Sequence, residues 1–170
     1  MIAKDFKTVN ELFPLLTIIN SKLPLFYIKE KYRGSSYNQG VNFNTEMINE
    51  LPIPEFSKET ILSLKIISEY ILFLKNIELK SVTDQLMPTY FEQIIDGMVY
   101  ELYFPELLKK HNREIIKHLG ELPEFTDKMS DEKKMSIIKI VFNRLNEREH
   151  TVRTNLFFMS SIPEIKIIEG

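Results

Sequence analysis

Residues 22–40 combine the side-chain types that contact nucleic acid. Four basic residues face a single acid, Glu30, which gives this segment a local net charge of +3. Aromatic residues are interleaved with the cations, and the run from Gly34 to Gly40 is rich in hydroxyl and amide groups. Cations bind phosphates, whereas amides and hydroxyls bind phosphates or base edges. The residues that we expect to contact DNA are Lys22, Lys29, Lys31, Arg33, Ser35, Ser36, Tyr37, Asn38 and Gln39. The alternative is a solvated loop beside a short strand.

A pair near the C-terminus suggests a second kind of chemistry. Glu164 and Lys166 flank an isoleucine in a β-branched run that predicts a strand. Such a pair is typical of one half of a nuclease site, in which carboxylates hold Mg²⁺ and the lysine polarises the phosphate. No preceding acid in a suitable context completes the pattern, so we keep a Mg²⁺ nuclease only as a residual alternative.

Other candidate catalytic residues have simpler structural explanations. His111 and His118 lie seven residues apart on one expected helix face, but no carboxylate cluster accompanies them and a zinc site is not predicted. Ser130 and Lys133 have the spacing of a serine–lysine motif whose partner motifs are absent, and a helix N-cap explains Ser130. The glycines form neither a Walker loop nor a dinucleotide fingerprint. We therefore expect no catalytic residue, metal or other cofactor on this chain.

Composition restricts the class of protein. The 170 residues fit one domain or two small ones, and 44% apolar with 27% charged residues is ordinary for a globular chain. The net charge of −2 gives no overall attraction to nucleic acid, so any such binding must come from a local patch. Cysteine is absent, which excludes disulfides and thiolate metal sites. Because no apolar run is long enough to span a bilayer or act as a signal peptide, we expect a soluble, cytoplasmic protein.

The elements that would position these residues are mainly helices. We predict a mainly α fold, a bundle of about five helices with a small irregular or β element in the N-terminal third and a short C-terminal strand over 162–168. Helix starts are expected at a Thr8 to Glu11 capping box, at Ser57, at Ser81 or Thr83, and at Ser130. The first helix should bury one stripe, formed by Leu12, Leu15, Leu16, Ile19 and Leu23.

Prolines and glycines define where these helices end or approach one another. Pro24 should end or kink the first helix, and Gly120 should end a helix that carries the apolar residues of 107–119. Gly97 should pack closely against a neighbouring helix. Residues 51–56, Leu-Pro-Ile-Pro-Glu-Phe, form a stiff connector because each proline fixes its own φ and extends the preceding residue.

Two further segments leave alternatives open. Residues 42–49 fit either a short strand or a helical turn. The helix after Ser57 is apolar on nearly all sides, so it should lie at the centre of the bundle or at an oligomer interface.

Two groups of motifs resemble a known family. Leu15-Leu-Thr-Ile-Ile-Asn-Ser-Lys-Leu23, Phe26-Tyr27 and Ile48-Asn-Glu-Leu-Pro-Ile-Pro-Glu55 resemble the end of the TaqI-like C-terminal specificity domain of adenine-N6 DNA methyltransferases. Tyr90-Phe-Glu-Gln-Ile-Ile-Asp-Gly-Met-Val-Tyr-Glu-Leu-Tyr-Phe-Pro-Glu106 is similar to the helical C-terminal tail of type IIG restriction-modification enzymes. The Asn-Pro-Pro-Tyr or Asp-Pro-Pro-Tyr motif of the catalytic domain is absent, so the chain resembles a C-terminal portion.

The resemblance implies separate roles for two parts of the chain and for a catalytic partner. Residues 1–56 would be the end of a target-recognition segment and 57–170 a helical C-terminal region. The expected partners are double-stranded DNA and a methyltransferase or endonuclease domain or subunit, to which S-adenosylmethionine and Mg²⁺ would belong. The expected function is DNA target recognition or docking without catalysis by this chain. The alternative is a helical interaction module that forms a homodimer or docks a methyltransferase through the helix after Ser57, without direct DNA contact.

Overall fold

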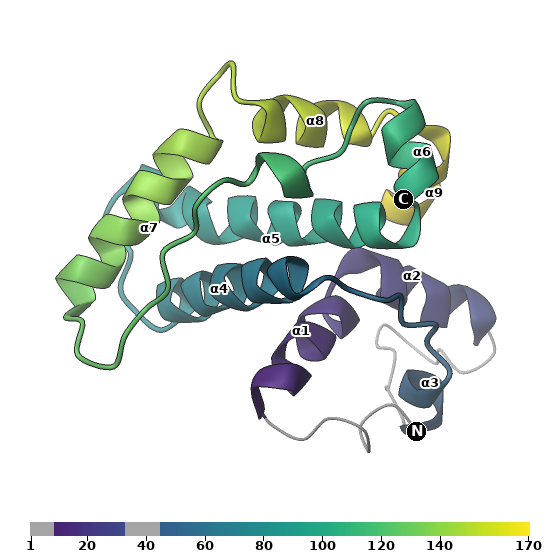
Figure 1. Cartoon of the computed structure of the whole chain (residues 1–170), viewed down its shortest axis with the longest axis horizontal. Coiled ribbons are helices and arrows are strands. Elements are labelled where there is room, and N and C mark those ends of the chain that lie inside the picture. The colour runs from purple at the N-terminus through teal and green to yellow at the C-terminus, as the bar shows by residue number, and fades with distance from the viewer. Residues whose placement is uncertain (1–8, 33–44) are drawn as a thin grey trace.

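The computed structural model describes residues 9–32 and 45–170. Helices dominate these residues and no strand occurs among them, so the prediction of a mainly α fold is confirmed (Figure 1). The elements are α1 (Val9–Ile19), α2 (Lys22–Lys31), α3 (Thr45–Asn49), α4 (Lys58–Lys75), α5 (Val82–Tyr103), α6 (Pro105–Lys110), the 3₁₀ turn η2 (Ile116–His118), α7 (Asp131–Leu145), α8 (Thr151–Met159) and α9 (Pro163–Glu169).

Helix α5 is the centre of the fold. Figure 1 shows α4 running along one side of α5 and α8 along the other, with α6 and α9 near its C-terminal end and α7 near its start. The predicted caps begin α4, α5 and α7, because the hydroxyls of Ser57, Ser81 and Ser130 accept the backbone N–H groups of Thr60, Asp84 and Lys133 respectively.

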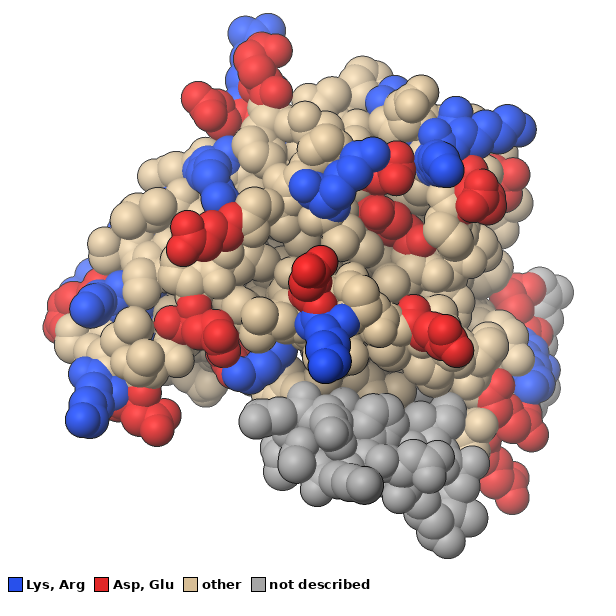
Figure 2. Space-filling model, viewed as in Figure 1, with Lys and Arg blue, Asp and Glu red and all other residues tan. Residues whose placement is uncertain are grey.

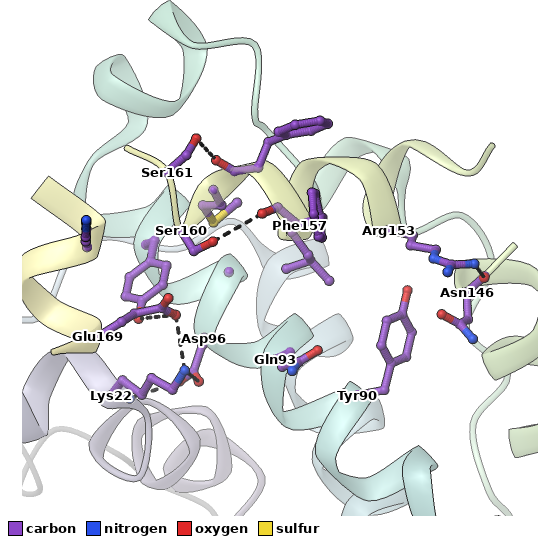
Figure 3. Close-up of a pocket in the computed structure, with 16 residues that line it drawn as sticks. Lys22, Tyr90, Gln93, Asp96, Asn146, Arg153, Phe157, Ser160, Ser161 and Glu169 are labelled. Atoms are coloured by element: carbon purple, nitrogen blue, oxygen red, sulfur yellow. Dashed lines mark hydrogen bonds and ion pairs between the residues drawn. The ribbon is translucent and has the colours of Figure 1, made fainter. Parts of the chain in front are cut away.

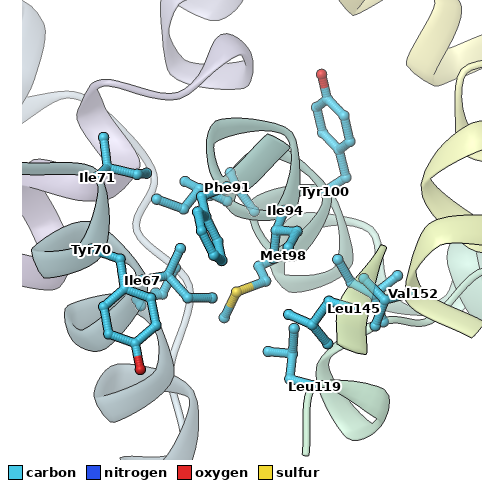
Figure 4. Packing of buried hydrophobic residues seen from close by; sticks show 14 of the residues in the cluster. Ile67, Tyr70, Ile71, Phe91, Ile94, Met98, Tyr100, Leu119, Leu145 and Val152 are labelled. Atoms are coloured by element: carbon cyan, nitrogen blue, oxygen red, sulfur yellow. The ribbon is translucent and has the colours of Figure 1, made fainter. Parts of the chain in front are cut away.

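The largest core cluster joins α5 to the helices around it. Figure 4 shows side chains of α5 facing α4 on one side and the C-terminal helices on the other. The fully enclosed members include Ile67, Tyr70, Phe91, Ile94, Met98, Leu145 and Val152. Helix α4 therefore packs most of its apolar side chains into the bundle beside α5, and only Leu62 and Leu72 among its large apolar side chains remain exposed.

Gly97 is packed as closely as its position in an apolar helix predicts. A Cβ atom there would lie 2.6 Å from Leu156 Cδ2 and 2.8 Å from Ile115 Cδ1. Both distances are shorter than an ordinary van der Waals contact, so α8 approaches α5 at a point where the absence of a side chain is needed.

The predicted C-terminal strand is wrong, because this segment forms α9. Pro163 occupies the first turn, where its fixed φ and missing N–H suit a helix. Ile162 and Ile165 are buried on the same face, three residues apart, so tertiary burial outweighs the β-branched composition. Glu164 and Lys166 are both exposed. They would share a face on a strand but not on a helix, which removes the geometry of the nuclease alternative.

The small β element is likewise unsupported in the described N-terminal residues. Ser21 separates α1 from α2, and Pro24 lies in the first turn of α2, where it is tolerated. Thr45–Asn49 is helical, which decides between the two alternatives for that part of 42–49. Thr8 lies outside the described residues. The predicted stripe of the first helix is partly wrong, because Leu16 is 56% exposed while Ile18 is fully buried.

The helix predicted over the apolar residues of 107–119 is broken. Asn112 adopts a left-handed φ of 53° and ends α6, with Arg113 N–H donating to the Leu108 carbonyl at 2.8 Å. The Glu101 carboxylate of α5 then accepts the N–H groups of Ile115 and Ile116 at 2.6 and 2.9 Å and starts η2. Gly120 follows η2 with a φ of 63°. His111 and His118 consequently do not share a helix face.

Candidate nucleic-acid interface

Helix α2 carries the predicted DNA contacts that lie within the described residues. Lys22 begins the helix, whereas Lys29 and Lys31 lie in its last turn. The helix therefore separates Lys22, which contacts α5, from the two lysines at its opposite end. The remaining predicted contacts lie outside the described residues: Arg33, Ser35, Ser36, Tyr37, Asn38 and Gln39.

Lys31 belongs to an exposed polar cluster with two tyrosines and one acid. Its Nζ lies 2.7 Å from Glu50 Oε2 and donates to the Tyr27 hydroxyl at 3.2 Å. The Tyr32 hydroxyl donates to the same Glu50 oxygen. The hydrogen bond to Glu50 raises the pKa of Lys31, and the reciprocal bond lowers the pKa of Glu50. Both groups are therefore charged at neutral pH.

Lys29 differs from its neighbours. Its side chain is exposed, and within the described part of the chain it has no hydrogen-bond or ion-pair partner. A lysine at the end of a helix also interacts favourably with the negative end of the helix dipole. Lys29 is therefore a cation that an external phosphate could approach without displacing a described acid.

Lys22 is held by two acids from other helices, and its side chain is 48% exposed. Its backbone N–H donates to Asp96 Oδ1 at 2.9 Å, and its Nζ lies 3.1 Å from Glu169 Oε1 and 3.7 Å from Asp96 Oδ2. Burial lowers the pKa of Lys22, but the hydrogen bonds and charges of Glu169 and Asp96 together raise it above its ordinary value. Burial also raises the pKa of Asp96, against the effect of Lys22. This junction joins α2 to α5 and α9.

A second, smaller apolar cluster supports the last turn of α2. Ile28 of α2, Met47 of α3 and Leu51 of the proline connector are buried together, and Ile53 packs against them. Phe56, at the other end of the connector, packs against the main core. The stiff connector thus links the cluster below Lys29 and Lys31 to the helical bundle.

The charge distribution shows no single-sign surface on the face drawn in Figure 2. Lys and Arg side chains alternate there with Asp and Glu side chains across the helical bundle. Many are paired, as Lys65 is with Glu69 and Glu124. A DNA contact must therefore be local, as the net charge of −2 requires.

A cleft that the sequence did not predict lies between α5, α8 and α9, with the start of α2 at one end (Figure 3). We call it the α5–α8 cleft. Its volume is about 880 Å³. Its lining includes Tyr90, Gln93, Gly97, Arg153, Phe157 and Lys166.

Exposed aromatic surface marks this cleft. Phe157 is 74% exposed and Phe158 43% exposed, whereas Met159 in the same helix is buried. The apolar run 156–159 contains the relevant signal, because consecutive helical residues point in different directions and cannot all face the core. A run of this kind therefore predicts that at least one apolar side chain lies on the surface. The sequence does not show which other helices lie beside that side chain.

Comparison of the chain with models of known protein families, with curated proteins and with solved structures found no match. In the described part of the chain, no helix combines the length and apolar character needed to cross a membrane. The same residues contain no group of three or more His, Asp or Glu side chains placed to hold a metal ion.

Proposed function

We propose that this chain is a DNA target-recognition or docking module of a restriction-modification system built around an adenine-N6 methyltransferase. Methyl transfer and cleavage would belong to a partner domain or subunit. The observation that carries the proposal is the exposed pair Lys29 and Lys31 at the end of α2, adjoining the polar segment 33–44. The resemblance of 15–55 and 90–106 to the corresponding enzymes supports the same assignment.

The ion pair of Lys31 is compatible with this role. Exposed pairs of this type contribute little to stability, because water screens the two charges. A DNA phosphate can therefore replace Glu50 as the partner of Lys31 at little energetic cost. The smaller apolar cluster under α2 favours the same role, because it holds the backbone on which both lysines stand.

Lys22 has a different role in this proposal. Its ammonium is engaged by Asp96 and Glu169, and its backbone N–H by Asp96. We therefore assign Lys22 to the attachment of α2, and Lys29, Lys31 and Arg33 to the phosphates.

The direct test is a salt titration of duplex binding, measured by fluorescence anisotropy. Wild-type protein should bind with an affinity that falls linearly against the logarithm of salt concentration, with a slope of about −0.9 per phosphate neutralised. The combined variant K29A/K31A/R33A should bind more weakly and have a shallower slope. Unchanged affinity and slope would overturn the proposal.

A matched control removes the same charge elsewhere. Lys80, Lys128 and Lys133 are exposed and have no ion-pair partner within the described residues. They lie near the start of α5 and α7, on the other side of the bundle from α2 (Figure 1). The variant K80A/K128A/K133A should keep the wild-type slope. An equal loss of slope in both variants would indicate non-specific charge attraction instead of a local interface.

A groove favours the second candidate function, docking of a protein partner. About 650 Å³ of space lies between α1, α2, α4 and α5. Its lining includes Leu16 and Leu72, which are 56% and 49% exposed, and the Thr17–Ser68 hydrogen bond at 2.7 Å. Size-exclusion chromatography with light scattering separates the candidates. A DNA-indifferent dimer that L16S/L72S converts to a monomer would favour the interaction module.

A further inference from the structure

The α5–α8 cleft has the size and access of a ligand site. Its volume of about 880 Å³ lies within the range of about 300–1,000 Å³ that is usual for ligand pockets. Gly97 also forms part of its lining, at the point where Leu156 of α8 packs against the backbone of α5. Figure 3 shows residues of α5 on one side and of α8 on the other, with the junction of Lys22, Asp96 and Glu169 at one end.

The aromatic wall of the cleft is held in place. Phe157 packs edge-on against Phe158, with ring centroids 5.1 Å apart and an angle of 86°. The guanidinium of Arg113 lies 5.0 Å from the centroid of Phe158 and covers that ring. Phe157 therefore rests on a supported neighbour while most of its own ring faces solvent. A flat aromatic ligand could stack on it without first ordering the side chain.

The polar groups in the cleft have unused hydrogen-bonding capacity. The side-chain amides of Gln93 and Asn146 have no hydrogen-bond partner within the described residues. Each amide offers both donors and an acceptor, which suits the mixed edge of a nucleobase. The hydroxyls of Ser160 and Ser161, which follow α8, instead donate to the backbone carbonyls of Phe157 and Phe158.

The charges favour an anion over a cation. Arg153 is exposed and donates only to the backbone carbonyl of Asn146, at 2.8 Å, among the described residues. Lys166 is exposed and has no described acid partner. The two carboxylates of the cleft, Asp96 and Glu169, are already engaged by Lys22. A phosphate beside Arg153 would thus meet unneutralised positive charge.

We infer that the α5–α8 cleft binds one unpaired nucleotide of a DNA strand. The base stacks on Phe157, its edge faces the amides of Gln93 and Asn146, and the phosphate lies beside Arg153. This inference rests on the proposed function, because it gives the DNA-docking module a second contact that recognises a nucleotide outside the duplex.

The test compares two labelled DNA duplexes of the same sequence, one fully paired and one with a single bulged nucleotide. Wild-type protein should bind the bulged duplex more tightly. Base–aromatic stacking contributes about 1–3 kcal/mol, so F157A should weaken binding of the bulged duplex by about 5- to 150-fold while leaving the paired duplex unaffected. F157W keeps an aromatic face and should retain the preference, and Q93A should reduce it.

Controls separate this inference from the proposed function. Ile140 is 64% exposed on α7 and does not line the cleft, so I140A should bind both duplexes like the wild type. Equal wild-type affinity for the two duplexes, or an F157A variant that keeps the full preference, would overturn the inference alone. Failure to bind either duplex would overturn the proposed function as well. Circular dichroism of F157A should match the wild type, since the removed ring is mostly exposed.

Discussion

Asp96 should stabilise the attachment of α2 by capping it from another helix. The side chain of Ser21, at the N-cap position, makes no cap hydrogen bond, and its hydroxyl instead donates to the Ile18 carbonyl. The carboxylate of Asp96 accepts the Lys22 N–H in its place, at 2.9 Å. Asp96 is 8% exposed, so this charge-assisted bond is shielded from water. A bond of that type contributes about 1.5–3 kcal/mol.

The substitution D96A should therefore lower the free energy of unfolding by about 2 kcal/mol. For a chain of this length, each kcal/mol corresponds to about 2–4 °C, so Tm should fall by about 4–8 °C. D96N keeps an acceptor oxygen without the buried charge whose desolvation raises the pKa of Asp96, so at neutral pH it should be at least as stable as the wild type. Thermal unfolding followed by circular dichroism measures both changes.

Glu92 provides a control on the same helix. It pairs with Lys75 at 2.6 Å, but the two side chains are 44% and 58% exposed. An exposed pair contributes little despite its short distance, so E92A should change Tm by no more than about 2 °C. If D96A and E92A shift Tm equally, the capping role of Asp96 is refuted.

The pH dependence gives an independent measurement. Because burial raises the pKa of Asp96, the folded protein retains a proton at a pH where the unfolded chain has lost it. The stability of the wild type relative to D96N should be greatest below the ordinary pKa of about 4 and should fall as pH rises through the folded-state pKa. A difference that stays constant across this range would contradict burial as the dominant influence on Asp96.

Three smaller predictions concern single contacts. Burial, followed by the charge of Arg144, lowers the pKa of His150, whose Nδ1 caps α8. Stability should thus fall as pH drops below about 6.5, and H150S should flatten that slope in urea unfolding at pH 5 and 7.5. G97A should lower the free energy of unfolding, measured in urea, by about 1–2 kcal/mol, and adding L156A should relieve part of that loss. A G97A variant as stable as the wild type would contradict the close approach of α8 to α5. Tyr103 has a buried hydroxyl without a described partner, so Y103F should leave Tm unchanged or raise it, and a fall would contradict that assignment.

Local chemistry in the sequence determined the helices and many of their starts. Ser57, Ser81 and Ser130 precede apolar helical periods, and each caps the helix that follows. Gly97 could be predicted as a close approach because glycine within an apolar helix otherwise has a conformational cost. These features depend on residues within a few positions of one another, which is why sequence alone was sufficient.

Two segments show where prediction from neighbouring residues failed. The β-branched segment 162–168 predicts a strand, but α9 forms because Ile162 and Ile165 bury one face against other helices. The break between α6 and η2 depends on Glu101, which accepts two N–H groups from residues that follow it by more than ten positions. Neither effect can be predicted from a short stretch of sequence, because both arise from contacts between separate helices.

The candidate DNA contacts divide in the same way. Sequence placed Lys22, Lys29 and Lys31 in one basic segment, and their charges are a property of residue type. Only the tertiary structure separates them, because Asp96 and Glu169 engage Lys22 while Lys29 remains exposed at the other end of α2. Sequence also contained the phenylalanines of α8, but the cleft beside Phe157 exists only because α8 and α9 meet α5, which is distant from them in sequence. Charge and hydrophobicity are local, whereas the partner of each side chain is decided by packing.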